Sequence, residues 1–197
     1  IFFRRTMSSL LPAEVWDLIV EFAASDCLSR VDRGLREALG RRYVRWTCHS
    51  TRAARALASW TGTLRTLKLK IVPDALAVGA AADAIGALRD APHLHTLTLD
   101  CSRCGLDAGS AQRLAALKDA PSLHTLALDL SCNGIGAAGA EALAALKDAP
   151  RLQTLTIDLH NNAIGAAGAQ ALAALAGAKG LHTLSLGLVN NAVGPDG

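Results

Sequence analysis

The feature that most constrains this chain is a repeat with a period of 29 residues. One copy, from Leu123 to Pro150, reads LHTLALDLSCNGIGAAGAEALAALKDAP and recurs nearly unchanged on both sides. Equivalent leucines open successive copies at Leu94, Leu123, Leu152 and Leu181, and Leu64 opens a looser copy before them. A fixed period of this length is typical of a solenoid, in which a unit buries its apolar face only by stacking on its neighbours. We therefore predict an array of stacked coils.

Each copy combines the periodicity of a strand with that of a helix. Leu126, Leu128 and Leu130 alternate with polar or small residues, as in a strand with one buried side. The segment from Asn133 to Gly136 contains two glycines and predicts a turn. A helical face follows the turn and is formed by Ala140, Leu143, Ala144 and Leu146. Each copy is thus expected to contribute one strand and one helix.

The repeat resembles the leucine-rich repeat family. The family pattern L-x-x-L-x-L-x-x-N/C-x-L is matched by Leu123, Leu126, Leu128, Asn133 and Ile135, with two additional residues before the asparagine. A register that starts at Thr125 restores the usual spacing. The long alanine-rich helix makes the chain similar to the ribonuclease-inhibitor type. This resemblance covers residues 64–197 and implies an α/β fold: a right-handed solenoid with a concave parallel sheet and convex helices.

A different kind of sequence precedes the repeats. The apolar spacing over residues 8–40 predicts a small all-α segment of short helices. This segment resembles an F-box, whose opening L-P-x-E…I…F is matched by Leu11, Pro12, Glu14, Ile19 and Phe22. The tryptophan-rich end of that motif is missing, and Leu35 holds its place. The resemblance implies that those five residues dock on the Skp-type adaptor of a cullin ubiquitin ligase.

These patterns divide the chain into four parts. We expect residues 1–7 to be a disordered or non-native N-terminus and residues 8–40 to be the F-box-like segment. Residues 41–62, with a strand-like RRYVRWTC and a helix-like TRAARALASW, are expected to form an N-terminal capping repeat. Residues 63–197 are then the leucine-rich repeats, the last of which is truncated at VGPDG.

The composition of the chain also indicates the cellular compartment in which it is found. No uncharged apolar run reaches about 18 residues, which disfavours a membrane span, and no secretory signal follows Met7. Five cysteines without such a signal favour a reducing environment. We expect an intracellular protein, cytoplasmic or nuclear.

The candidate binding residues are those that alternate with the buried leucines of the strands. Parallel strands stack equivalent positions about 4.8 Å apart, so Asp100, Asp129 and Asp158 should form an acidic column on the concave face. Like charges at that spacing are expected to raise one another's pKa unless a cation relieves them. A partner protein with a basic surface would supply such a cation. The alternative is that the aspartates only keep the end of each strand solvated. The hydroxyl-bearing candidates beside this column are Thr96, Thr98, Thr125, Thr154, Thr156, Thr183 and Ser185.

Two further sets of residues suggest a metal or redox site. Cys101 and Cys104 form a C-x-x-C pair, but they align with Leu130 and Asn133, and no second pair follows at ligand spacing, which favours a structural role. A histidine column is formed by His95, His124 and His182, with Arg65 and Gln153 completing it. Because Gln153 interrupts the column, we interpret it as a polar ladder at the strand starts. We predict no metal or cofactor.

Catalytic motifs such as G-x-S-x-G, a Walker loop or H-E-x-x-H are not found. The sequence therefore favours a non-enzymatic scaffold that binds a protein partner, with a substrate receptor of a ubiquitin ligase as its more specific form. One alternative is nucleic-acid binding, because eight arginines oppose only Asp32 and Glu37 between Leu28 and Trp60. Another is a ribonuclease-inhibitor-like protein whose acidic column blocks a basic active site. Binding of a small molecule is not expected.

Overall fold

The computed structural model describes residues 43–48, 62, 64–71 and 85–194. The F-box-like segment, with its adaptor residues Leu11, Pro12, Glu14, Ile19 and Phe22, lies outside the described residues, as does the expected helix of the capping repeat. Within the described part, strands and helices alternate as the repeat predicts.

One parallel sheet of six strands runs through the described residues, in the order of the sequence. Its strands are β1 (Tyr43–Cys48), β2 (Thr66–Ile71), β3 (Thr96–Asp100), β4 (Thr125–Asp129), β5 (Thr154–Asp158) and β6 (Thr183–Gly187). Every strand pairs with its neighbours without a register slip, so equivalent residues of successive copies lie side by side. β1 confirms the strand predicted in RRYVRWTC.

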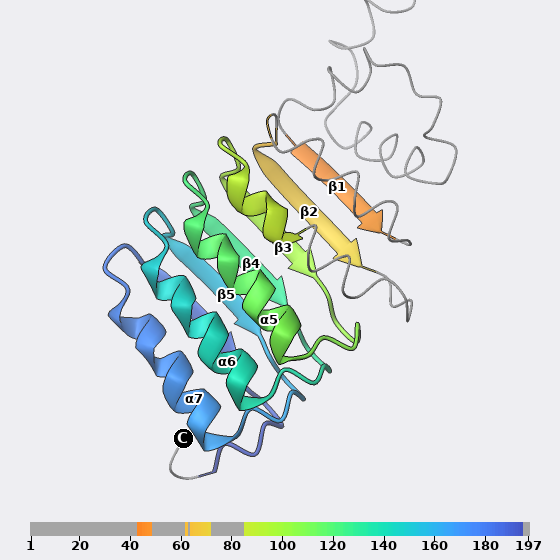
Figure 1. The fold of residues 1–197 in the computed structure, drawn as a ribbon, viewed down its shortest axis with the longest axis vertical. Coiled ribbons are helices and arrows are strands. Elements are labelled where there is room, and N and C mark those ends of the chain that lie inside the picture. The colour runs from red at the N-terminus through yellow and green to blue at the C-terminus, as the bar shows by residue number, and fades with distance from the viewer. Residues whose placement is uncertain (1–42, 49–61, 63, 72–84, 195–197) are drawn as a thin grey trace, which may run out of the picture.

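Helices cover one face of this sheet (Figure 1). They are η4 (Ala87–Asp90), α5 (Ala108–Ala115), η5 (Ala116–Asp119), α6 (Gly136–Ala144), η6 (Ala145–Asp148), α7 (Gly165–Ala173) and η7 (Ala174–Gly177). The letter η marks a 3-10 helix, the tighter winding that often closes an α-helix. α6 packs between α5 and α7. None of the helices in the described ranges is long and apolar enough to cross a membrane.

The core lies between the two layers and passes without interruption from coil to coil. Leu126, Leu128 and Leu130 are each at most 1% exposed, as the strand periodicity predicts. Leu143 and Leu146 meet them from the helical side. In the coil of β6, by contrast, the equivalent apolar residues are only partly buried, and these are Leu181, Leu184, Leu186 and Leu188.

A ladder of side-chain amides, from Asn133, Asn162 and Asn191, closes the turns after β4, β5 and β6. Asn162 Nδ2 donates to the backbone oxygens of Leu130, at 2.9 Å, and Leu159, at 3.0 Å. Its Oδ1 accepts from the backbone nitrogen of Ile135 at 3.3 Å. Leu130 O also accepts from Asn133 Nδ2 at 2.7 Å, so consecutive coils share one carbonyl. Because the side chain of Asn162 is 1% exposed, these bonds replace lost contacts with water. The asparagine of the motif therefore fastens each coil to the next.

Candidate functional site

The sheet face opposite the helices, here called the open face, gathers every binding residue that the sequence predicts within the repeats. Three columns of side chains run across it, one for each outward position of the strands. The first is Thr66, Thr96, Thr125, Thr154 and Thr183; the second is Lys68, Thr98, Ala127, Thr156 and Ser185; the third is Lys70, Asp100, Asp129, Asp158 and Gly187. The predicted stacking of these positions is confirmed.

From β3 to β6 the first two columns carry short, uncharged side chains, and on β2 the second column carries Lys68. Thr156, Thr183 and Ser185 are exposed, and the remaining threonines of these columns are half-buried. Threonine and serine hydroxyls both donate and accept hydrogen bonds, so this surface can pair with polar groups of either kind. A cavity of about 420 Å³ lies away from it, beside η6 and η7, and is lined by Lys147, Asp148, Pro150 and Lys179 among others. The open face is therefore suited to a broad contact.

Charge is concentrated in the third column. Lys70 Nζ lies 2.8 Å from Asp100 Oδ2, an ion pair that links β2 to β3 across the open face. Burial works to raise the pKa of Asp100, but hydrogen bonds from Lys70 and Ser102 outweigh it and leave that pKa below its ordinary value. The hydrogen bond to Asp100 in turn raises the pKa of Lys70. A cation from the chain itself thus neutralises the first aspartate.

Each aspartate also turns back onto the residue two positions later. Asp129 Oδ1 accepts from the backbone nitrogen of Ser131 at 3.1 Å and from its hydroxyl at 2.6 Å. Asp158 Oδ1 accepts from the backbone nitrogen of His160 at 3.0 Å and from its Nδ1 at 2.9 Å. In Asp158, burial works to raise the pKa, and the bonds from His160 lower it below its ordinary value. The pKa values of Asp100 and Asp158 thus lie below their ordinary values, because Lys70 and the donors within the turns stabilise the charged carboxylates, which is the relief by a cation that the sequence analysis made a condition.

These bonds use one carboxylate oxygen and leave the other available. Oδ1 carries the contacts within the turn in Asp100, Asp129 and Asp158. Among the described residues, the Oδ2 of this column is engaged only in Asp100, by Lys70. Asp129 and Asp158 therefore present one free acceptor each beside the hydroxyls of the open face.

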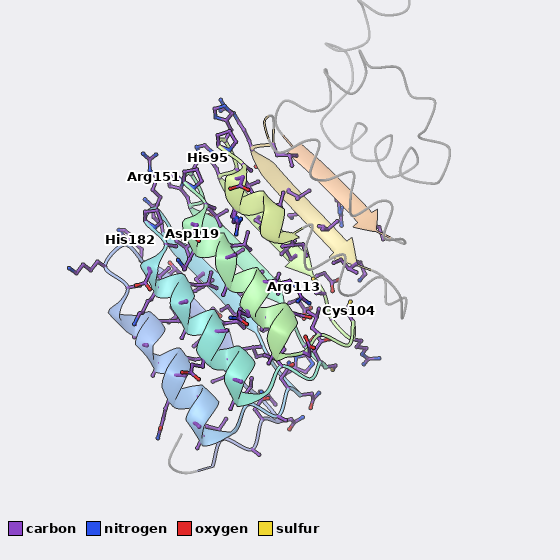
Figure 2. All side chains as sticks on the ribbon, in the orientation of Figure 1. His95, Cys104, Arg113, Asp119, Arg151 and His182 are labelled. Carbon is purple, nitrogen blue, oxygen red and sulfur yellow. The ribbon has the colours of Figure 1, made fainter. Side chains whose placement is uncertain are left out.

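The histidine column lies at the opposite end of the strands. Figure 2 shows His95 and His182 along one edge of the molecule and Cys104 at the other. From His95 onward, each backbone nitrogen in the column donates to the preceding coil, as His124 does to the oxygen of His95 at 2.9 Å. Nδ1 of His95 and of His124 lies 2.6 Å from the carbonyl oxygen two residues earlier, and the two rings stack with centroids 5.1 Å apart. The interpretation as a polar ladder is confirmed.

Cys104 takes the place of the asparagine in its coil, as the alignment predicts. Its Sγ donates to the backbone oxygens of Ile71, at 3.6 Å, and Ser102, at 3.4 Å. Burial raises the pKa of the Cys104 thiol to about 11, so it stays protonated at neutral pH. Within the described ranges no group of three His, Cys, Asp or Glu side chains is arranged to hold a metal ion. The structural reading of Cys104 is thus supported by its own contacts.

Cys132 and His160 are the pair that sequence reasoning missed. The sequence alone shows no obvious partner for Cys132, but its Sγ lies 3.5 Å from His160 Nε2. The signal was in the period: a residue stacks on the one 29 positions later, so Cys132 lies over Asn161 and beside His160. His160 takes the place that Ser131 has in the preceding coil, so comparison of the copies shows a histidine only in this coil.

A parallel sheet in sequence order, one helix for each complete coil and a ladder of amides after the strands together define a leucine-rich-repeat solenoid. Residues 123–144 and 151–173 match the family model of the leucine-rich repeat. Over these two segments the chain is similar to the leucine-rich repeat family. A comparison with curated proteins found no match.

Proposed function

We propose that this chain is a non-enzymatic scaffold that binds a protein partner through the open face of its sheet. Leucine-rich repeats generally mediate contacts between proteins, and solenoids do so through extended surfaces. The observation that supports this proposal is the open face itself, where hydroxyls and two free carboxylate oxygens stand in register over several strands. Such a surface provides many weak polar contacts over a broad area.

The free oxygens specify the chemistry of the partner. Asp129 and Asp158 occupy paired positions on β4 and β5, and lysine or arginine is the complementary group on a protein. Threonine hydroxyls next to them accept or donate at the rim of such a contact. A partner with a basic patch flanked by polar side chains fits this part of the face.

Reversal of one charge tests this assignment. Asp129→Lys should abolish capture of partners from lysate of the source cell, because two positive surfaces repel each other. Glu141→Lys makes the same charge change on α6, which lies on the helical side, and should leave capture intact. Retention of partners by Asp129→Lys, or their equal loss from both variants, would refute binding at the open face.

We further propose that residues 8–40 connect the scaffold to a cullin ubiquitin ligase. The support is the F-box-like set Leu11, Pro12, Glu14, Ile19 and Phe22. Under this proposal the repeats select the substrate and the N-terminal segment holds the Skp-type adaptor. The intact chain should retain purified adaptor in a pull-down, and a variant with Pro12 and Ile19 replaced by Ala should not. No retention by the intact chain would discard the ligase role and leave the scaffold untouched.

Enzyme inhibition of the ribonuclease-inhibitor kind is a second candidate, favoured by the same free oxygens. A basic active site would meet Asp129 and Asp158 as it meets an acidic substrate. Inhibition of a basic ribonuclease by the intact chain, lost in Asp129→Lys, would support this role. Full ribonuclease activity in the presence of excess chain would remove it.

A further inference from the structure

The turns after β4 and β5 bring a cysteine, a histidine and an aspartate into one line. Cys132 Sγ lies 3.5 Å from His160 Nε2. The other ring nitrogen, His160 Nδ1, lies 2.9 Å from Asp158 Oδ1. A nucleophile, a base that contacts it and a carboxylate that orients the base are the three parts of an activated thiol. The three side chains come from two successive coils, at the ends of neighbouring strands.

The backbone holds this line in place. Cys132 N donates to the oxygen of His160 at 2.9 Å, which fixes the two turns against each other. Cys132 and Asn161 stack at equivalent positions, and both adopt the left-handed conformation with φ of 54°. This conformation is unfavourable for residues with a side chain, so the surrounding turn enforces it. Asn161 Nδ2 also lies 3.5 Å from Cys132 Sγ, which places a second donor at the sulfur.

The electrostatics at the sulfur favour its negative form. The hydrogen bond from Asn161 lowers the pKa of Cys132; burial opposes this, while Arg103 and His160 reinforce it. The carboxylate of Asp158 raises the pKa of His160 through their hydrogen bond. The charged and titratable groups near the sulfur come from three coils. Arg103 lies in the turn after β3, and Asp129 is the last residue of β4. Asp158 is the last residue of β5, and His160 lies in the turn that follows it. These shifts favour a thiolate beside a protonated imidazole.

The other described cysteines of the repeats provide a contrast within the same fold. Cys101 and Cys104 are 1% and 4% exposed, whereas Cys132 is only half-buried. Burial holds the pKa of Cys104 at about 11. A reagent in solution therefore has access to an activated sulfur only at Cys132 among these three.

We propose that Cys132 is a modification site that forms a mixed disulfide with low-molecular-weight disulfides. The Cys132 thiolate attacks one sulfur of the disulfide, a new Sγ–S bond forms, and the original S–S bond breaks. Its electron pair leaves with the second sulfur, and that thiolate takes up the proton held on His160 Nε2. The low-molecular-weight disulfide is the oxidant; one half of it stays bonded to Cys132, and the other half is released as a thiol. This chemistry goes beyond the proposed scaffold role and requires no protein partner.

The test uses the full chain with oxidised glutathione as the probe. Peptide mass mapping after timed quenching should show Cys132 modified faster than Cys101 and Cys104. Alkylation by iodoacetamide across pH should rise at Cys132 with a midpoint below the ordinary thiol value of about 8.5. His160→Gln should move this midpoint upward and slow the modification at neutral pH roughly tenfold.

His182→Gln is the matched control. It removes a histidine from the opposite end of the strands, where its ring contacts the backbone oxygen of Gly180 at 2.9 Å. Its midpoint and rate at Cys132 should equal those of the unmodified chain. If His160→Gln loses its fold by circular dichroism, Asp158→Asn replaces it, and this variant should give a smaller upward shift. An ordinary midpoint at Cys132, or no shift in the folded variant, would overturn the proposal.

Discussion

The coil that begins with β3 and the two that begin with β4 and β5 share one backbone but stabilise it with different side chains. In the coils of β4 and β5, the side chains of Asn133 and Asn162 donate hydrogen bonds to backbone carbonyls of the turn after the strand. In the β3 coil, the thiol of Cys104 takes this role. α6 and α7 begin at Gly136 and Gly165 without a side-chain cap. α5 instead follows Asp107, which caps the helix. The shape of a coil is therefore set by positions that several chemistries can occupy.

These chemistries differ in strength. The amide of an asparagine donates two protons and accepts at its oxygen, so one side chain can hold three backbone groups. A thiol is a weak donor and accepts poorly. Asn162 accordingly bonds to Leu130, Leu159 and Ile135, whereas Cys104 reaches two carbonyls at longer distances. The β3 coil should be less tightly joined to its neighbour at this point.

Replacement of the ladder asparagine is the largest effect that we expect. Asn162→Ala removes at least three hydrogen bonds at a site that is 1% exposed, and each contributes about 1 kcal/mol net. The free energy of unfolding should fall by about 3 kcal/mol in urea titrations. Cys104→Ala, the matched change in the β3 coil, should cost only about 1 kcal/mol. Equal losses would show that thiol and amide are equivalent in the ladder, contrary to the comparison.

A Gly→Ala substitution should change the free energy of unfolding in opposite directions in α6 and in α5. A Cβ at Gly139 of α6 would lie 2.5 Å from Ile135 Cγ2 and 3.1 Å from Ala111 Cβ, inside the contact with α5. Gly139→Ala should therefore destabilise the chain by about 2 kcal/mol, because overpacking exceeds the gain in helix propensity.

Gly109 of α5 is the control for that change. A Cβ there would meet Asp107 Oδ1 at 3.6 Å, an ordinary contact, so Gly109→Ala should be neutral or stabilise by about 0.5 kcal/mol. Thermal unfolding of the two variants measures both signs. A stabilised Gly139→Ala would mean that the helices are not in close contact at this point.

Most of the fold followed from the period of the sequence. The period placed Leu126 and Leu128 in the core and Asp100, Asp129 and Asp158 in one column, because parallel coils align equivalent residues. It did not reveal how the aspartates are paired. Lys70 and His160 are departures from the consensus, and their contacts depend on side-chain geometry within a turn. The site was therefore predictable in position, but its charge distribution was not.

The cap of α5 should give the smallest effect, visible through pH. Asp107 Oδ1 accepts from the backbone nitrogen of Ser110 at 2.8 Å and from its hydroxyl at 2.7 Å. These hydrogen bonds lower the pKa of Asp107. A carboxyl with a depressed pKa stabilises the folded state above its unfolded pKa of about 4, and the contribution is lost as pH falls through the folded value.

Asp107→Asn keeps a capping side chain but removes the charge. Its Tm should lie slightly below that of the parent chain at pH 6, and the difference should shrink as pH falls below about 4. Asp100 and Asp158 also have depressed pKa values, but they are common to both proteins and cancel in the difference. Gly136→Ala in α6, a position with φ of 63°, is destabilising for steric reasons and should lower Tm equally at each pH. A constant difference for Asp107→Asn would show that the charge of the cap contributes nothing, and that the two kinds of helix start differ only in backbone conformation.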